Sequence, residues 1–220
     1  MKKIIRCTAL ILSLSMLFLL CSCDDKKSTL EIDGIEGNTA SLDYDTSNPV
    51  VAISVKYYGV IVIELYPDIA PNTVNNFISL VKSGFYDGNT IHRMQPGFVM
   101  QGGDPTGTGQ GNPGYYIKGE FSANGFINPL KHTKYVVSMA RGTPYDSGGC
   151  QFFIMLGDDS SLDGYYAAFG KVIDGFDVCD EIGRITRCNP VNGKLTQNLT
   201  ITKAVVDTKG VNYPEPDKIK

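Results

Sequence analysis

Apolar residues occupy every second position in the stretch that follows residue 49. Val51, Ile53 and Val55 alternate with smaller or polar residues, and this period of two is typical of a β-strand. Tyr58-Gly59 supplies a turn, and the β-rich run 60–66 leads back along the chain. We therefore expect a β-hairpin to open a folded domain that begins at residue 49.

The pattern then changes to one expected for a helix. Pro71 suits the first helical turn, and Gly84 is a typical helix end. Between them, apolar residues at positions 74, 77, 78 and 81 form a stripe with the spacing of a helix that packs one face against a core. A second, shorter helix is predicted over residues 176–182.

The other apolar runs are short, rich in β-forming residues and separated by glycine-rich turns. They cover residues 98–101, 135–139, 152–155, 167–172 and 199–206. Many short strands with two helices favour a mainly β fold, a closed antiparallel β-barrel capped at its ends. The domain is expected to end at residue 208, and residues 209–220, which include two prolines, are expected to form a loose tail.

Residues 1–22 differ in character from the domain. Three basic residues precede the apolar run 8–20, whose 13 residues are fewer than the ~20 needed to span a bilayer. The following Leu20-Cys21-Ser22-Cys23 resembles a bacterial lipoprotein signal. That resemblance implies cleavage after residue 22, lipid on Cys23, and an exported protein that is held at a cell membrane and faces away from the cytoplasm. An ordinary secretory peptide and an uncleaved anchor are the alternatives. Residues 23–48 are polar and turn-rich, and are expected to be a flexible tether.

Charge and cysteine content narrow the functional classes. Loss of residues 1–22 removes three of the 20 basic residues and none of the 23 acidic ones, which leaves a formal charge of −6. Nucleic-acid binding normally needs a basic surface, so no nucleic-acid partner is expected. The domain has three cysteines, an odd number that argues against a full disulfide framework. Cys179 and Cys188 either pair or stay reduced, and Cys150 is interpreted as a packing residue rather than a reactive thiol.

Three other patterns lack the context that their chemistry requires. The GxGxxG match at 109–114 is interrupted by Pro113 and followed by a β-type run, which favours a tight loop over a nucleotide site. His92 and His132 have neither zinc-ligand spacing nor a nucleophile signature, and both are interpreted as structural. The acidic residues at 158, 159 and 163 lack the spacing of an EF-hand calcium loop. No metal and no cofactor are expected.

The most informative segment is Ile91-His-Arg-Met-Gln-Pro-Gly-Phe-Val-Met-Gln-Gly-Gly-Asp104. It places one cation, Arg93, and one amide, Gln101, among apolar residues and without a nucleophile. Taken alone, Arg93 fits an exposed strand residue. Rotation about an X-Pro peptide bond, however, needs little more than a fixed cation and an apolar pocket, and the later segment 151–155 supplies further apolar side chains.

Six motifs together resemble those of the cyclophilin-type peptidyl-prolyl isomerases. They are HRMQPGFVMQGGD, GTGQGNPGYYIKGE, LKHT, SMAR, QFFIM and LDGYYAAFGKV, and they occur in the family order over about Val50–Thr208. The resemblance implies an eight-stranded antiparallel β-barrel with two capping helices. It also implies cis-trans isomerisation of X-Pro bonds in unfolded or exported polypeptides, without a cofactor. A monomer is the default expectation.

The same resemblance assigns roles to single residues. Arg93 matches the catalytic arginine, and Gln101 matches the glutamine that orients it and contacts substrate. The walls of the proline pocket match Phe98, Val99, Phe153 and Leu162. The rim that binds the peptide backbone matches Ala140, Arg141 and Tyr166, with Arg141 standing where the family usually has asparagine and Tyr166 where it often has histidine. Ser161 stands where many members have tryptophan, a change expected to affect inhibitor binding more than catalysis.

Rotation about an X-Pro bond has a barrier of about 18–20 kcal/mol because it breaks amide resonance. The prolyl nitrogen gains a lone pair as the bond twists, and a hydrogen bond from Arg93 to that nitrogen lowers the barrier because it strengthens in the transition state. The competing hypothesis is a peptide-binding chaperone module without important turnover. A redox protein based on Cys150 is a weaker alternative.

Overall fold

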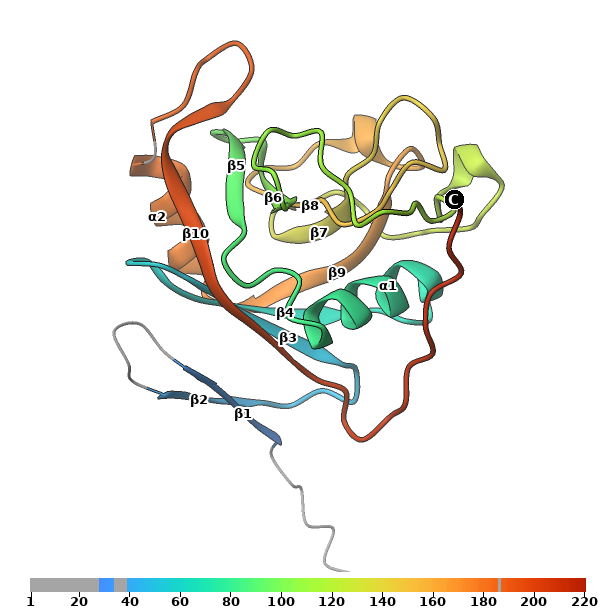
Figure 1. Ribbon diagram of the computed structural model, residues 1–220, viewed down its shortest axis with the longest axis horizontal. Coiled ribbons are helices and arrows are strands. Elements are labelled where there is room, and N and C mark those ends of the chain that lie inside the picture. The colour runs from blue at the N-terminus through green and yellow to red at the C-terminus, as the bar shows by residue number, and fades with distance from the viewer. Residues whose placement is uncertain (1–27, 34–38, 186) are drawn as a thin grey trace, which may run out of the picture.

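The computed structural model describes residues 28–33, 39–185 and 187–220. Eight antiparallel strands close into a barrel in the order β10-β3-β4-β9-β7-β8-β6-β5 (Figure 1). The strands are β3 (Val50–Val55), β4 (Gly59–Leu65), β5 (Thr90–Gln95), β6 (Val99–Asp104), β7 (Val136–Met139), β8 (Phe152–Met155), β9 (Ala167–Asp174) and β10 (Lys194–Asp207). The expected barrel is confirmed.

Helices α1 (Pro71–Lys82) and α2 (Phe176–Ile185) lie at the predicted positions. The predicted stripe of α1 is buried, and Phe77 packs against the rings of Tyr86, Phe152 and Phe169 at centroid distances of 5.0–5.3 Å. Gly84 follows α1 with a φ of +71°, a conformation that favours glycine. Two short 3-10 helices, η2 (Ser122–Asn124) and η3 (Ser160–Leu162), lie in the loops. Among the described residues, no helix combines the length and the apolar character needed to cross a membrane.

Residues 23–48 contain more regular structure than a tether would. Within this range β1 (Ser28–Asp33) pairs antiparallel with β2 (Thr39–Tyr44), and β1 lies beside β3 and β10 of the barrel (Figure 1). The expectation of a flexible segment is wrong for these two strands. Apolar residues do alternate with polar ones here, Leu30 and Ile32 in β1 and Ala40, Leu42 and Tyr44 in β2, so the period of two was a usable signal that the polar character of the segment concealed. Residues 1–27, with the predicted signal peptide and Cys23, lie outside the described residues.

Residues 209–220 are held against the domain, so the prediction of a loose tail is also wrong. The tail crosses α1 and ends beside the loop that precedes η2 (Figure 1). Asn72 of α1 exchanges two hydrogen bonds with the backbone of Asp217, and Ile219 exchanges two with the backbone of Tyr116. Contacts of this kind have no sequence period and were not visible in the pattern of apolar residues.

Candidate active site on the outer face of the barrel

Strand alternation divides the apolar residues of the barrel into two clusters. Alternate residues such as Phe152 and Ile154 of β8 join the main core inside the barrel. Their neighbours Phe153 and Met155 face outward and join a separate, smaller cluster. The buried part of this outer cluster consists of Val99, Val136, Phe153, Met155 and Ala168, from β6, β7, β8 and β9, and Phe98, Leu130, Ala140, Leu162 and Tyr166 pack against it. Six of the seven residues expected to bind substrate therefore lie together, and only Arg141 lies outside the cluster.

A β-bulge places Arg93 on this outer face. Ile91 pairs with Gly102 and Arg93 pairs with Gln101, so His92 is an extra residue in β5. Ile91 and Met94 both belong to the inner core. Strict alternation from Ile91 would point Arg93 inward, and the bulge corrects its direction. The bulge also breaks the period of two, which is why β5 was absent from the predicted strands.

The strand register extends from Arg93 into the apolar cluster. Gln101 stands between Arg93 of β5 and Phe153 of β8, and Phe153 in turn pairs with Ser138 of β7. Directly paired residues of antiparallel strands have side chains on the same face. The cation, the amide and the apolar pocket are thus consecutive positions of one row across the sheet.

Neutral amides hold the Arg93 guanidinium. Its Nη1 donates to Oε1 of Gln101 at 3.3 Å, and its Nη2 donates to Oε1 of Gln95 at 2.6 Å. Gln101 Nε2 donates to Oε1 of Gln151 at 2.9 Å, and Gln151 Nε2 donates to the carbonyls of Gly109 and Gly111 at 3.1 and 2.9 Å. Arg93 makes no salt bridge within the described part of the chain. Its positive charge is therefore not neutralised and is available to a ligand.

Sequence reasoning missed Gln95 and Gln151. Gln95 lies two residues beyond Arg93, so the period of a strand places both side chains on one face and was a usable signal. Gln151 immediately precedes β8 and is the first residue of the motif QFFIM, which was a usable signal, although only the apolar residues of that motif were given a role.

His132 packs against Phe153 of the apolar pocket and is held in place by polar contacts. Its ring stacks on Phe153 at a centroid distance of 6.1 Å, Nδ1 lies 3.1 Å from Asp163, and Nε2 lies 3.0 Å from Oγ of Ser138. Burial lowers the pKa of His132, although Asp163 acts in the opposite direction. These contacts bear out a structural role for His132, and they engage Asp163 in packing the pocket.

Arg141 lies at the rim rather than beside Arg93. Its guanidinium lies over the rings of Tyr166, Phe121 and Tyr145 at 4.6–5.2 Å, and its Nε donates to the carbonyl of Tyr165 at 3.0 Å. The side chain thus links the loop after β7 to the segment before β9. The Ser161 side chain bonds to Asp159 at 2.6 Å within η3, so it stays inside that turn.

A side cavity of about 530 Å³ adjoins the row of site residues. Its lining is mostly polar and includes Gln101, Gly111, Tyr116, Ala140, Gly149 and Gln151. Because Gln101 and Ala140 also border the apolar pocket, a ligand that fills the pocket can extend a neighbouring side chain into this cavity.

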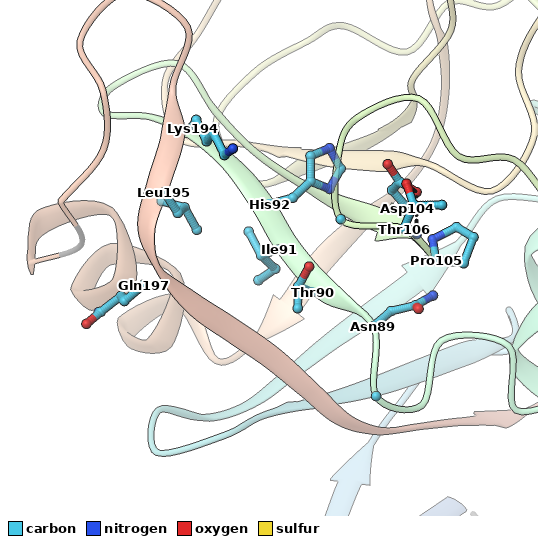
Figure 2. Close-up of a pocket in the computed structure, with 12 residues that line it drawn as sticks. Asn89, Thr90, Ile91, His92, Asp104, Pro105, Thr106, Lys194, Leu195 and Gln197 are labelled. Atoms are coloured by element: carbon cyan, nitrogen blue, oxygen red, sulfur yellow. Dashed lines mark hydrogen bonds between the residues drawn. The ribbon is translucent and has the colours of Figure 1, made fainter.

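Figure 2 shows a second and smaller pocket, of about 220 Å³, which is lined in part by residues of β5. Lys194 and Gln197 of β10 line one side, and Asp104 and Thr106 line the other. The ring nitrogens of His92 are buried there and have no hydrogen-bond partner among the residues that the structure describes, and burial lowers the pKa of His92. None of the predicted site residues lines this pocket.

The Asp104 carboxylate accepts hydrogen bonds from the loop whose Gly109 and Gly111 carbonyls bind Gln151. Burial alone would raise the pKa of Asp104, but hydrogen bonds from Thr106, Gly111 and Gly109 outweigh burial and lower it to about 2. The GxGxxG match at 109–114 lies in this loop, and no α-helix begins at its last glycine; the next element is the three-residue 3-10 helix η2 at Ser122–Asn124. The interpretation as a tight loop is confirmed.

All three cysteines of the domain are free in this structure, so Cys179 and Cys188 do not form a pair. Cys150 and Cys179 are buried, and burial raises the pKa of each thiol to about 12. A thiol with so high a pKa is a poor nucleophile, which supports the interpretation of Cys150 as a packing residue. In the described ranges, no group of three or more acidic, histidine or cysteine side chains is placed to hold a metal ion.

Comparisons with known proteins agree with this geometry. Residues 50–206 match the family model described as cyclophilin type peptidyl-prolyl cis-trans isomerase. Peptidyl-prolyl cis-trans isomerase B of Bacillus subtilis is 50% identical over 114 residues, which cover 52% of this chain and 76% of that protein. A peptidyl-prolyl cis-trans isomerase of Helicobacter pylori is 45% identical over 126 residues, 56% of this chain and 74% of that protein. A cyclophilin-type isomerase from Cryptosporidium parvum, crystallised in the presence of the dipeptide Ala-Pro, has a similar structure with a TM-score of 0.65 and 32% identity. That match covers 72% of this chain and 98% of the other.

Proposed function

Because the chain belongs to the family of cyclophilin-type peptidyl-prolyl cis-trans isomerases, we propose that Arg93 is the group that accelerates rotation about X-Pro bonds. The activity is peptidyl-prolyl isomerisation, and the substrates are proline-containing polypeptides. The observation that carries the assignment of Arg93 is its place in the structure. It is a cation held by two neutral glutamines, and only the position of Gln101 separates it from Phe153 of the apolar cluster in the row across the sheet.

The catalytic step is a change in hydrogen bonding rather than a covalent reaction. In the planar amide the prolyl nitrogen is a poor acceptor, because its lone pair is shared with the carbonyl group. Twisting the bond localises that lone pair, and an Nη–H of Arg93 donates to it. The bond strengthens as the transition state is approached, which is the condition for a lower barrier. Arginine remains protonated throughout, so no proton transfer is needed.

The apolar cluster holds the proline ring while the bond turns. Phe98, Val99, Phe153 and Leu162 form the pocket walls in this proposal, and Tyr166 closes the edge of Phe153 at a centroid distance of 5.7 Å. Burial of a ring of this size contributes roughly 1.5–3 kcal/mol, which suits weak and transient binding of many substrates. The Ala-Pro dipeptide used with the Cryptosporidium relative supports proline as the ligand class.

Gln101 and the rim complete the proposed site. Gln101 orients Arg93 and contacts the substrate, and the backbone near Ala140 and Arg141 holds the residue before proline. The Ala140 N–H already donates to the carbonyl of Gln151 at 2.9 Å. This segment is therefore fixed relative to the amide chain, Gln101 and Gln151, that holds Arg93.

A refolding assay tests turnover against simple binding. We expect substoichiometric amounts of the protein to accelerate the slow, proline-limited phase of a test substrate. A protein that acted only as a peptide-binding chaperone would suppress aggregation and leave the rate of that phase unchanged.

We also propose that the isomerase works outside the cytoplasm on exported polypeptides, held at a membrane by lipid on Cys23. The support comes from the sequence alone: a basic start, a short apolar run, and Leu20-Cys21-Ser22-Cys23. Acyl chains contribute about 0.8 kcal/mol per buried CH₂, so several chains on one cysteine give stable anchoring.

Metabolic labelling with a radioactive fatty acid in a bacterial host tests the anchor. We expect label on the wild-type chain, none on Cys23→Ser, and normal labelling of the matched control Cys21→Ser. Label that persists in Cys23→Ser, or its absence from the wild-type chain, would remove the basis for the proposed membrane attachment.

A further inference from the structure

The C-terminal tail ends on the wall of the side cavity. Tyr116 lines this cavity, and its backbone N–H and carbonyl exchange hydrogen bonds of 2.8 and 2.7 Å with Ile219. The ammonium of Lys218 lies 4.8 Å from the ring centre of the neighbouring Tyr115. The last residues of the chain therefore hold two consecutive residues of the loop that borders the site.

The restraint extends through Tyr115 to α1 and to Gly149, a second residue that lines the cavity. The Tyr115 hydroxyl donates to Oδ1 of Asn76 at 2.7 Å, and Nδ2 of Asn76 donates to the carbonyl of Gly149 at 2.6 Å. Asn76 is fully buried in α1, and Gly149 lines the cavity beside the segment 113–117, where Gly148 pairs with Ile117. Hydrogen bonds, together with the backbone that joins Tyr115 to Tyr116, thus connect the tail, α1 and Gly149.

The tail itself is anchored to α1 by separate contacts. The backbone of Asp217 exchanges bonds of 2.8 and 3.2 Å with Asn72, and the Ser79 hydroxyl donates to Glu215 at 3.1 Å. Further back, Tyr213 packs against the main core. These contacts fix the path of the tail, so the pairing with Tyr116 is imposed by a segment that is docked independently of the cavity.

We propose that residues 215–220 position the Tyr116 wall and thereby set how strongly the isomerase binds a substrate side chain in the side cavity. The chemical class is a long side chain able to form hydrogen bonds, because amide side chains and glycines make up eight of the fifteen lining residues and the two charged ones, Arg141 and Asp146, have opposite signs. Within the described residues, no hydrogen bond joins Tyr116 to Arg93, Gln101 or Gln151. The tail should therefore affect substrate binding and leave the rotation step unchanged. This inference rests on the isomerase activity stated above.

The matched pair Ile219→Pro and Ile219→Ala tests the proposal in the full-length chain. Proline removes the Ile219 N–H and restricts the backbone, whereas alanine keeps both backbone bonds. The Ile219 side chain is 40% exposed, so neither change disturbs the core. The substrates are peptides that share one X-Pro bond. One series carries glutamine, and the other carries alanine, at the position two or three residues before the proline.

We expect Ile219→Pro to raise KM for a glutamine peptide roughly three- to tenfold and to leave kcat unchanged. A change of this size corresponds to the loss of about one net hydrogen bond. The alanine peptides, and all peptides with Ile219→Ala, should behave as with the wild type. Three results would overturn the proposal. The wild-type enzyme could show no preference for glutamine at either position, the KM of Ile219→Pro could be unchanged, or its KM could rise equally for the glutamine and the alanine peptides. A chain ending at Pro214 repeats the test if Ile219→Pro does not fold. Absence of wild-type turnover on every peptide would instead contradict the isomerase function.

Discussion

Gln151 gives the sharpest test of how the site is assembled, because it does not belong to the proline pocket. We predict that Gln151→Leu lowers kcat/KM although the substituted side chain lies two hydrogen bonds away from Arg93. Leucine has a similar size but offers Gln101 no acceptor. It also leaves the carbonyls of Gly109 and Gly111 without their donor. The Gln101 amide is then free to turn, and the guanidinium loses a fixed partner.

The magnitude follows from the one bond that reaches the site. A net contribution of about 0.5–1.5 kcal/mol for the Gln101–Gln151 bond corresponds to a roughly two- to twelvefold loss in kcat/KM. The loss should lie mainly in kcat, because the walls of the proline pocket keep their contacts. The assay is isomerisation of a short X-Pro peptide, with urea unfolding to show that the variant is folded.

Gln197→Leu is the matched control, since the Gln197 side chain is exposed and donates to the Tyr58 hydroxyl, away from Arg93, Gln101 and the side cavity. It should retain wild-type kinetics. A folded Gln151→Leu variant with wild-type kcat would refute the idea that the amide chain positions Arg93.

The remaining predictions concern ionisation and thiols. Burial lowers the pKa of His132 and His92 below that of the unfolded chain, about 6.5, so the unfolded state takes up protons first as the pH falls. The free energy of unfolding should therefore be largest above pH 7 and decrease below about pH 6.5. A further decrease should occur as the pH falls from about 4 towards 2, where Asp104 is protonated. Urea titrations at several pH values check this, and stability that rises between pH 7 and 5 would contradict it. His132→Gln should flatten the upper part of the curve. In alkylation of the folded protein at neutral pH, Cys188, which is half-buried, should react before the buried Cys150 and Cys179. Mass spectrometry of the labelled peptides decides, and labelling of Cys150 as fast as Cys188 would be inconsistent with the packing found here.

The sequence was sufficient where its apolar residues follow a simple period, even where, as in β3, the structure buries both faces of the strand. The hairpin of β3 and β4 and the stripe of α1 follow from alternation and helical spacing, and both are confirmed. β5 was not predicted, because the extra residue His92 shifts the pattern in the middle of the strand. That irregularity directs Arg93 to the outer face, so the feature that hid the strand is also the one that builds the site.

The grouping of the pocket residues came from the motifs and not from local pattern. Phe98 and Leu162 are distant in the chain, and only the closed barrel brings both to the outer cluster. Gln151 and the docked tail depend on single hydrogen bonds between side chains and backbone. Such bonds leave no period in the sequence, which explains why both were missed.

In the proposed mechanism Arg93 acts on the transition state rather than on binding. The most direct test of this role is one peptide measured twice, for isomerisation rate and for dissociation constant, with wild type and Arg93→Ala. We predict that kcat/KM falls by about 2–4 kcal/mol, or roughly 30- to 1,000-fold, while the dissociation constant changes less than about threefold. A folded Arg93→Ala variant that isomerises the peptide at nearly the wild-type rate, or that loses activity only in proportion to lost binding, would contradict the account.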